Sequence, residues 1–276
     1  MASIISPKAE VSPKAKIGDN CKIYPFAYIE DDVVIGDNCT IYPFVSIMNG
    51  TRMGNNNKVF QAAVIAALPQ DFHFTGEESE VVIGDNNTIR ENVVINRGTR
   101  KGGKTVLGNN NFLMEGAHVS HDTVIGNGCV FGYGTKIAGD CVIGNGVIYS
   151  TSVVENAKTR VGDLAMIQAG TTFSKDIPPY IIAGGKPVKY AGPNTIIMEQ
   201  LSLPRRFASI LLMPTDWYSM VRHPSSMPLT RSRIRCQMDR RFRTSSSSWR
   251  VQRRVSSLRC KDCVDVGIFS SLILYL

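Results

Sequence analysis

Two histidines and their neighbours are the part of this chain best suited to chemistry. His118 and His121 lie in the stretch from Leu113 to Gly139, and Asp122 directly follows His121. A histidine beside a carboxylate suits a general base, because the carboxylate can orient the imidazole and stabilise its cation. These residue types at this spacing therefore predict a proton transfer at His121.

A repeat of six residues determines where these side chains lie. Counting in sixes from Ile5 to Phe173 gives 29 positions, here called guide positions. Of these, 25 are apolar, whereas apolar residues make up only 43% of the whole chain. This period fits neither an amphipathic helix nor an alternating strand and is typical of a parallel β-helix built from hexapeptides. Three hexads make one triangular coil, so every eighteenth residue returns to the same edge, about 4.8 Å farther along.

The register places both histidines away from the packed interior. His118 lies five residues after the guide residue Leu113, and His121 lies two after Val119. Guide residues point inward, so neither histidine belongs to the apolar column. Gly139 follows His121 by three hexads and is expected to stack on it. A glycine N–H there can approach a reacting carbonyl without a side chain in the way, as an oxyanion donor must.

Two stretches interrupt the repeat without shifting its register. Residues 66–82 contain Pro, Gly and charged residues but no hexad, and residues 97–106 are glycine-rich and basic. We expect both to be loops outside the coil, where binding groups are commonly carried.

Two further features of the hexads lead to expectations about local structure. A glycine often follows the guide residue, as in IGDNC, and we expect it to serve a turn that needs permissive backbone angles. Glu155 puts a carboxylate on a guide position, where an unpaired charge would be costly. We expect Lys158 or Arg160 to pair with it, or the coil to bulge there.

The charge balance differs between the two parts of the chain. Residues 1–200 hold 17 Lys and Arg against 19 Asp and Glu, a net of −2, whereas residues 201–276 hold 14 against 4, a net of +10. The repeat region therefore gives no reason to expect a nucleic-acid partner. No apolar stretch has the length of a transmembrane segment or of a signal-peptide core, so we expect a cytoplasmic protein.

The last part of the chain has a different composition. Residues 201–276 contain 13 Arg but one Lys, 14 Ser, one Gly and no Glu. Permitted codons for residues 208–228, read two bases on, can spell an amphipathic helix. We infer that residues 201–276 are an out-of-frame translation of a lost helical domain and expect a disordered or poorly folded tail. A natural basic tail is the alternative.

The repeat region also resembles a known family. The stretch AHVSHDTVIGNGCVFGYGTKIAGDCVIGN is similar to the active-site segment of bacterial acyl-carrier-protein–UDP-N-acetylglucosamine O-acyltransferases. QDFHFTGEESEVVIGDNNTIRENVVINRGT and DIPPYIIAGGKP match too, so the similarity covers about residues 1–200. It implies a left-handed parallel β-helix over residues 1–192, with residues 193–200 beginning a C-terminal segment, and a homotrimer with active sites between neighbouring prisms.

The resemblance also implies a reaction. It is the transfer of a (R)-3-hydroxyacyl chain from acyl carrier protein to the 3-hydroxyl of UDP-N-acetylglucosamine, the first step of lipid A synthesis. No metal and no cofactor besides the acyl carrier protein would be needed. His121 matches the catalytic base, Asp122 the residue that polarises it, and Gly139 the oxyanion donor.

The resemblance assigns further positions to the substrates. Matches to substrate-binding positions are Asp71, His118, Asn96 and Asn194, and matches to positions that measure acyl length are Ala169 and Pro187. The chain departs from many members at Asn96 and Asp140, where they have histidine, and at Asn156–Ala157, where they have a His-Gln pair.

Several alternatives stay open on the sequence. Another hexapeptide acyltransferase could use coenzyme A, or the chain could be the N-acyltransferase of the same pathway, although that relative has an extra N-terminal domain. A metal hydratase on the same coil would need three converging histidines, and only His73 and His223 add to the two already named. The prism could also be inactive if its C-terminal domain is lost.

Overall fold

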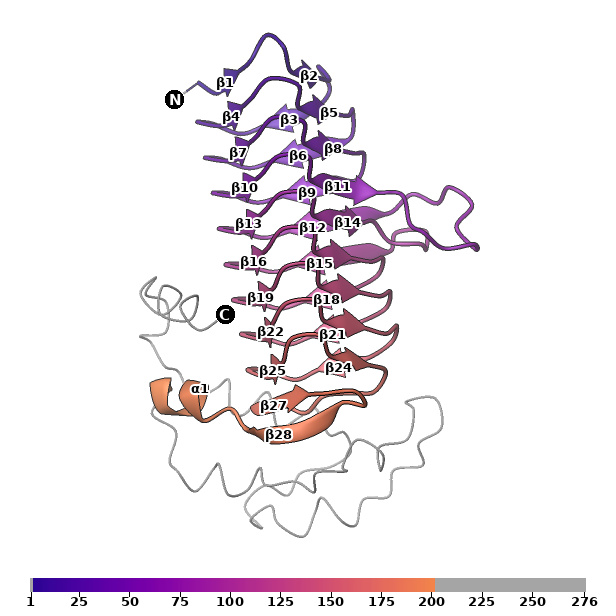
Figure 1. Ribbon diagram of the computed structural model, residues 1–276. Helices are drawn as coiled ribbons and strands as arrows, with labels where there is room; N and C mark the ends of the chain where they lie inside the picture. Colours follow the sequence, from indigo (N-terminus) through magenta and orange to yellow (C-terminus); the bar gives the residue numbers. More distant parts are fainter. Residues whose placement is uncertain (1, 202–276) are drawn as a thin grey trace, which may run out of the picture. The chain divides into compact units, whose positions relative to one another are not determined.

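The computed structural model describes residues 2–201, which form one stack of triangular coils (Figure 1). Strands of two to five residues make three flat sides, and tight turns make the edges between them. The tail predicted to be out of frame lies, from residue 202 on, outside the described residues.

Three sheets run along the prism, each adding one strand per coil. The first contains, in spatial order, β1 (Ile4–Ile5), β4 (Lys22–Ile23), β7 (Thr40–Ile41), β10 (Lys58–Val59), β13 (Thr88–Ile89), β16 (Phe112–Leu113), β19 (Val130–Phe131), β22 (Ile148–Tyr149), β25 (Met166–Ile167), β27 (Ile181–Gly184) and β28 (Lys189–Pro193). The second contains β2 (Glu10–Val11), β5 (Tyr28–Ile29), β8 (Ser46–Ile47), β11 (Val64–Ala67), β14 (Val94–Asn96), β17 (His118–Val119), β20 (Lys136–Ile137), β23 (Val154–Glu155) and β26 (Thr172–Phe173). The third contains β24 (Arg160–Val161), β21 (Val142–Ile143), β18 (Val124–Ile125), β15 (Lys104–Leu107), β12 (Glu80–Ile83), β9 (Thr51–Met53), β6 (Val33–Ile35) and β3 (Lys16–Ile17).

The strands pair in the register that the repeat predicts. Neighbouring strands are parallel, and away from the two interruptions most partners are eighteen residues apart, as in His118↔Lys136. The last strand, β28, instead returns antiparallel to β27 and leads to α1 (Thr195–Gln200). Guide residues such as Ile41 and Leu113 are completely buried and form the core. Burial is looser in the first coil, where Ile5 is 44% exposed.

The turns at the edges correct the expectation about glycine. The backbone enters the left-handed region three residues after the guide position, usually at Asn, Asp or Gly, as at Asn38 with a φ of 58°. The glycine directly after the guide residue is there for space: a Cβ on Gly36 would lie 2.5 Å from Asn55 Oδ1. Its role is close coil-to-coil packing, so the explanation by permissive angles was wrong.

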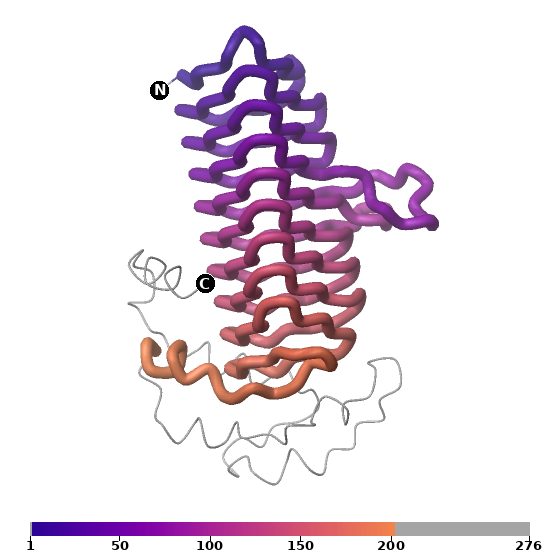
Figure 2. Tube along the Cα trace, in the orientation of Figure 1, coloured from indigo at the N-terminus to yellow at the C-terminus, as the bar shows by residue number. Residues whose placement is uncertain are grey.

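Two excursions leave the coil at the edge that follows the second sheet (Figure 2). The predicted bounds were too wide, because β11 extends to Ala67 and β12 begins at Glu80, while β15 begins at Lys104. The excursions are residues 68–79 and 97–103. They lengthen the spacing of paired guide residues, with Ile65↔Ile95 thirty residues apart instead of eighteen.

Glu155 is held by neutral partners inside the prism. Tyr149 Oη and Thr159 Oγ1 each donate a hydrogen bond of 2.7 Å to its two carboxyl oxygens. Arg160 instead pairs with Asp176 at 2.6 Å, and Glu155 keeps its register with Ile137, so the expected ion pair and bulge were both wrong. Burial raises the pKa of Glu155 to about 7.

Candidate active site

One edge of the prism carries most of the groups predicted to do chemistry. The excursions 68–79 and 97–103 and the turns after β17 and β20 all follow strands of the second sheet. The stacking of the coils therefore brings residues that are far apart in sequence to the same edge.

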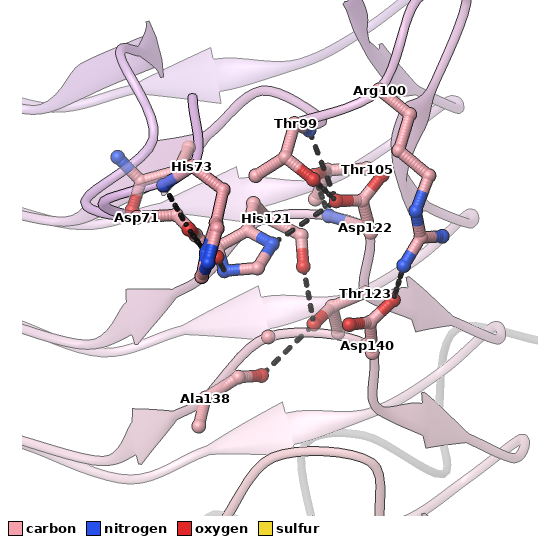
Figure 3. Close-up of polar contacts among 12 residues, drawn as sticks. Asp71, His73, Thr99, Arg100, Thr105, His121, Asp122, Thr123, Ala138 and Asp140 are labelled. Carbon is pink, nitrogen blue, oxygen red and sulfur yellow. Dashed lines mark hydrogen bonds and ion pairs between the residues drawn. The ribbon is translucent and has the colours of Figure 1, made fainter. Parts of the chain in front are cut away.

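His121 and Asp122 form a hydrogen-bonded pair (Figure 3). His121 Nδ1 lies 3.0 Å from Asp122 Oδ2, and the two side chains are only 13% and 7% exposed. Asp122 occupies the left-handed turn position, with a φ of 56°, which Asp tolerates better than most residues. Because a carboxylate only accepts, Nδ1 carries the proton and Nε2 keeps its lone pair when the ring is neutral.

Thr99, from the second excursion, holds the Asp122 carboxylate. The Thr99 N–H and Oγ1 donate to Asp122 Oδ2 at 3.0 and 2.7 Å, and the Asp122 N–H donates to Thr105 Oγ1 at 2.9 Å. Burial is the largest single effect on the pKa of Asp122 and would raise it. The hydrogen bonds from Thr99 and His121, with Arg100 nearby, outweigh it and lower that pKa.

Asp71, from the first excursion, faces the other nitrogen of the base. Its Oδ2 lies 3.6 Å from His121 Nε2, which is longer than a hydrogen bond (Figure 3). The other oxygen, Oδ1, accepts from the His73 N–H at 2.7 Å and lies 3.0 Å from His73 Nδ1. These bonds, the backbone one first, lower the pKa of Asp71.

Gly139 stacks on His121 as the register predicts. A Cβ on Gly139 would lie 2.5 Å from His121 Nε2, so only glycine fits against the ring. Like Gly139, Asp37 lies two residues after a guide position, but at another edge of the prism. Its N–H donates to Oδ1 of Asn55, the residue eighteen positions later in the next coil. One coil after Gly139 stands Ala157, whose methyl group accepts nothing. Within residues 2–201 the Gly139 N–H has no acceptor.

His118 and Asn96 lie beside this group. His118 Nε2 is 2.6 Å from Asn96 Oδ1, and Asn96 Nδ2 donates to the carbonyl oxygens of Leu68 and Ala67 at 2.8 and 3.4 Å. Asn96 is fully buried, whereas His118 is partly exposed. Asn96 therefore lies behind His118 and at the base of the first excursion.

An ion pair forms part of the lining of the cleft at this edge. Arg100 Nη2 lies 2.8 Å from Asp140 Oδ1 and so links the second excursion to the turn after β20. The cleft has a volume of about 520 Å³ and is lined by Asp71, His73, Glu77, Thr99, Arg100, Lys101, His121, Asp140 and Lys158. Thr99 and Arg100 escaped the sequence analysis, because only the conformation of the excursion turns them toward Asp122 and Asp140. Thr105 was missed because it lies at the start of β15, inside the stretch that was predicted to be loop.

Three predicted residues lie elsewhere on the chain. Ala169 follows β25 of the first sheet, and Pro187 lies between β27 and β28. Asn194 precedes α1, is buried, and donates through Nδ2 to the Leu164 carbonyl at 3.0 Å. A single chain therefore does not bring them to the edge that carries His121.

Among residues 2–201, no helix is long and apolar enough to cross a membrane. Nor does this range contain a group of three His, Cys, Asp or Glu side chains placed to hold a metal ion.

Comparison with known proteins gives consistent matches. The bacterial transferase hexapeptide family (six repeats) matches residues 14–49 and 104–139. The acyl-[acyl-carrier-protein]–UDP-N-acetylglucosamine O-acyltransferase of Sulfurovum sp. (strain NBC37-1) is 42% identical over 193 residues, which are 70% of this chain and 74% of that protein.

Solved structures agree with the sequence matches. LpxA, a UDP-N-acetylglucosamine acyltransferase from Bacteroides fragilis, has a TM-score of 0.73 at 52% identity, covering 75% of this chain and 82% of its own. The UDP-N-acetylglucosamine acyltransferase of Francisella novicida has a TM-score of 0.73 at 33% identity, covering 79% and 84%. The prediction of a left-handed parallel β-helix of hexapeptide repeats is confirmed.

Proposed function

The chain belongs to the family of acyl-[acyl-carrier-protein]–UDP-N-acetylglucosamine O-acyltransferases, and we propose that His121 is the general base of its reaction. In this reaction a (R)-3-hydroxyacyl chain passes from acyl carrier protein to the sugar 3-hydroxyl of UDP-N-acetylglucosamine. The observation that carries the proposal is the His121–Asp122 pair, with Nε2 turned toward the cleft.

The proton moves through His121 in two steps. Nε2 takes the proton of the sugar hydroxyl as its oxygen attacks the thioester carbonyl, so that a carbon–oxygen bond forms and the carbonyl oxygen becomes an oxyanion. The carbon–sulfur bond then breaks, and the imidazolium returns the proton to the leaving thiolate. Asp122 stabilises the imidazolium in between, and such general-base help is typically worth about 10²–10⁴-fold in rate.

Gly139 is suited to the developing charge on the carbonyl oxygen. Its N–H lies beside the base and is not used by another group of residues 2–201. One donor of this kind contributes about 10²–10³-fold in kcat to comparable acyl transfers. No covalent intermediate on the chain is required, because the base and the oxyanion donor act on the two substrates directly.

Asp71 is suited to the acceptor sugar. It lies opposite His121 Nε2 across a gap of 3.6 Å, and its carboxylate accepts hydrogen bonds. A sugar hydroxyl bonded to Asp71 would hold the ring next to the base. His118 lies on the same edge and is proposed to contact the same substrate.

The positions proposed to measure acyl length favour a site completed by a second copy. Ala169 and Pro187 follow strands of the first sheet, whereas His121 follows the second, so one chain places them on different edges. Neighbouring prisms of a homotrimer would bring the two edges together, and Asn194 would reach the nucleotide in the same way. We place this trimer in the cytoplasm, with acyl carrier protein as the partner that delivers the donor.

The remaining proposal concerns the tail. Residues 201–276 are proposed to be an out-of-frame translation, on the composition and codon argument alone. The nucleotide sequence around codon 200 decides this directly. If the shifted reading frame of the gene stays open and encodes a helical domain, the proposal is supported. If the gene has no such frame, the proposal is contradicted.

The function is tested with the purified full chain. We expect the 3-hydroxyacyl chain to move from acyl carrier protein to UDP-N-acetylglucosamine, detected as an ester product by mass spectrometry. Faster transfer from the coenzyme A thioester would favour the coenzyme A alternative, and transfer only to a UDP-sugar with a 3-amino group would favour the N-acyltransferase. No transfer to any acceptor would point to an inactive prism.

A further inference from the structure

Asn96 is completely buried at the candidate site and uses both ends of its amide. On one side its Nδ2 lies 2.8 Å from the Leu68 carbonyl oxygen and 3.4 Å from that of Ala67. On the other side its Oδ1 lies 2.6 Å from His118 Nε2. The residue therefore joins the base of the first excursion to a histidine of the site.

The chemistry of these partners leaves one orientation. Backbone carbonyl oxygens only accept hydrogen bonds, so the amide nitrogen of Asn96 must face Ala67 and Leu68, and its oxygen must face His118. An amide oxygen also only accepts. The hydrogen bond of 2.6 Å therefore requires a proton on His118 Nε2.

His118 holds this proton as a neutral ring. Burial, followed by the charge of Lys136 on β20 and by His121, lowers the pKa of His118. A neutral imidazole with its proton on Nε2 has a lone pair on Nδ1. Within residues 2–201 no donor is bonded to that nitrogen.

We propose that Asn96 is a positioning residue that sets His118 as the Nε2–H tautomer, so that Nδ1 accepts a hydrogen bond from a hydroxyl of the acceptor sugar. The ligand assignment rests on the proposed function. Nδ1 in this state repels phosphate and carbonyl oxygens, since these are acceptors too, and it pairs with a donor such as a sugar hydroxyl.

The two histidines of the site then have opposite tautomers. His121 holds its proton on Nδ1, against Asp122, and offers Nε2 as the base. His118 holds its proton on Nε2, against Asn96, and offers Nδ1 as an acceptor. The two rings therefore present lone pairs on different nitrogens, and only the ring of His121 is backed by a carboxylate that stabilises its cation.

The tautomer is measured on the full chain by two-bond ¹H–¹⁵N correlation of ¹⁵N-labelled histidine at pH 7.5. His118 is assigned by the signal lost in His118→Gln. We expect Nε2–H in the wild type, a substantial Nδ1–H population in Asn96→Leu, and return of Nε2–H in Asn96→Asp, which keeps an acceptor. Asn57→Leu is the matched control, because Asn57 is equally buried and donates to the Gly84 carbonyl away from the site.

Either of two results would overturn the tautomer assignment. One is a wild-type His118 protonated on Nδ1, alone or together with Nε2, at pH 7.5. The other is an Asn96→Leu protein that folds and keeps the wild-type tautomer. Neither readout depends on acyl transfer, so the tautomer assignment holds or fails separately from the proposed function. If Asn96→Leu does not fold, the wild-type spectrum and the ligand series below decide.

The ligand is tested with UDP-N-acetylglucosamine analogues whose 4- or 6-hydroxyl is replaced by fluorine, which cannot donate. One of them should bind the wild type about 5- to 10-fold more weakly by calorimetry, the size of one hydrogen bond, and show no such loss in His118→Phe. Asn96→Leu should raise KM for the nucleotide sugar by a similar factor with a smaller effect on kcat. Equal binding of both analogues by the wild type would show that Nδ1 does not accept from a sugar hydroxyl.

Discussion

Gly139 lies so close to His121 that the ring occupies the place of a side chain. A Cβ on Gly139 would be 2.5 Å from Nε2 and 2.9 Å from Nδ1 of His121. The two residues stand on successive coils, and the Asp140 N–H donates to the His121 carbonyl at 3.0 Å, so the backbone cannot easily separate them. The ring is therefore positioned from one side by glycine and from the other by Asp122.

Gly139→Ala should lower both stability and rate. The added methyl group overlaps the His121 ring, and such overpacking typically costs about 1–3 kcal/mol. We expect kcat to fall, because the ring must move away from the base position. The test is a double-mutant cycle: in a His121→Ala background, Gly139→Ala should destabilise much less in denaturant unfolding. Equal destabilisation in both backgrounds would mean that the ring is not the cause.

His121→Ala should remove acyl transfer while leaving the fold almost unchanged. The residue lies off the packed column, and the loss of a general base typically costs about 10²–10⁴-fold in rate. Rates are compared with saturating donor and acceptor, and thermal unfolding of both proteins is followed by circular dichroism. Activity within about threefold of the wild type would remove His121 from this role.

Thr99→Val should weaken the support of the base. The variant loses the 2.7 Å bond from Oγ1 to Asp122 but keeps the one from the backbone N–H. Hydrogen bonds to charged groups are worth about 1.5–3 kcal/mol, so kcat should fall about tenfold or more, with little change in KM. Thr99→Ser should retain the rate.

Thr51→Val is the matched control for this series. Thr51 is fully buried and donates to the Met48 carbonyl at 2.8 Å, three coils before the base. It should change stability but not kcat. A wild-type pH–rate profile in Thr99→Val, together with a normal kcat, would contradict the role assigned to Thr99.

Glu155 should make stability depend on pH. Its pKa is about 7 in the folded chain against an ordinary value of 4.5, so the folded state binds the proton more tightly. The tighter binding of the proton adds on the order of 3 kcal/mol to the free energy of unfolding. This stabilisation is fully present below pH 4.5 and is lost as pH rises through 7. Glu155→Gln should remove most of this fall between pH 5 and 8, measured by denaturant unfolding.

The exposed Glu10 provides a control for that measurement. Glu10→Gln should leave the pH dependence of the wild type unchanged. If Glu155→Gln loses stability with rising pH as steeply as the wild type, the carboxyl of Glu155 is not the group that titrates.

The sequence predicts those parts of the molecule that depend only on the repeat. The burial of Ile41 and Leu113 and the stacking of Gly139 on His121 follow from counting residues, because each coil has the same length. The excursions break this rule, and Thr99, carried by one of them, was missed for that reason. Its contact with Asp122 depends on the path of a loop, which has no period.

Errors about single residues have a different origin. The glycine after each guide residue was explained by its backbone angles, whereas Gly36 shows that the next coil leaves no room for a Cβ. Glu155 was expected to need a cation, but burial raises the pKa of its carboxyl to about 7, and the hydroxyls of Tyr149 and Thr159 serve as neutral partners in place of a cation. Both errors arise because contacts with other hexads are not visible from one hexad: those of Gly36 are in the next coil, and those of Glu155 are in neighbouring hexads of its own coil.

The excursions bear on how such a chain can change over evolutionary time. Paired guide residues are thirty apart across the first excursion and twenty-four across the second, Ile95↔Val119, yet the coil continues as if nothing had been inserted. Each excursion leaves and re-enters at one edge, so its length is free of the constraint on every other residue. Insertions and deletions can therefore accumulate beside His121 without disturbing the packing of the coils. A new substrate preference can arise there while the prism stays the same.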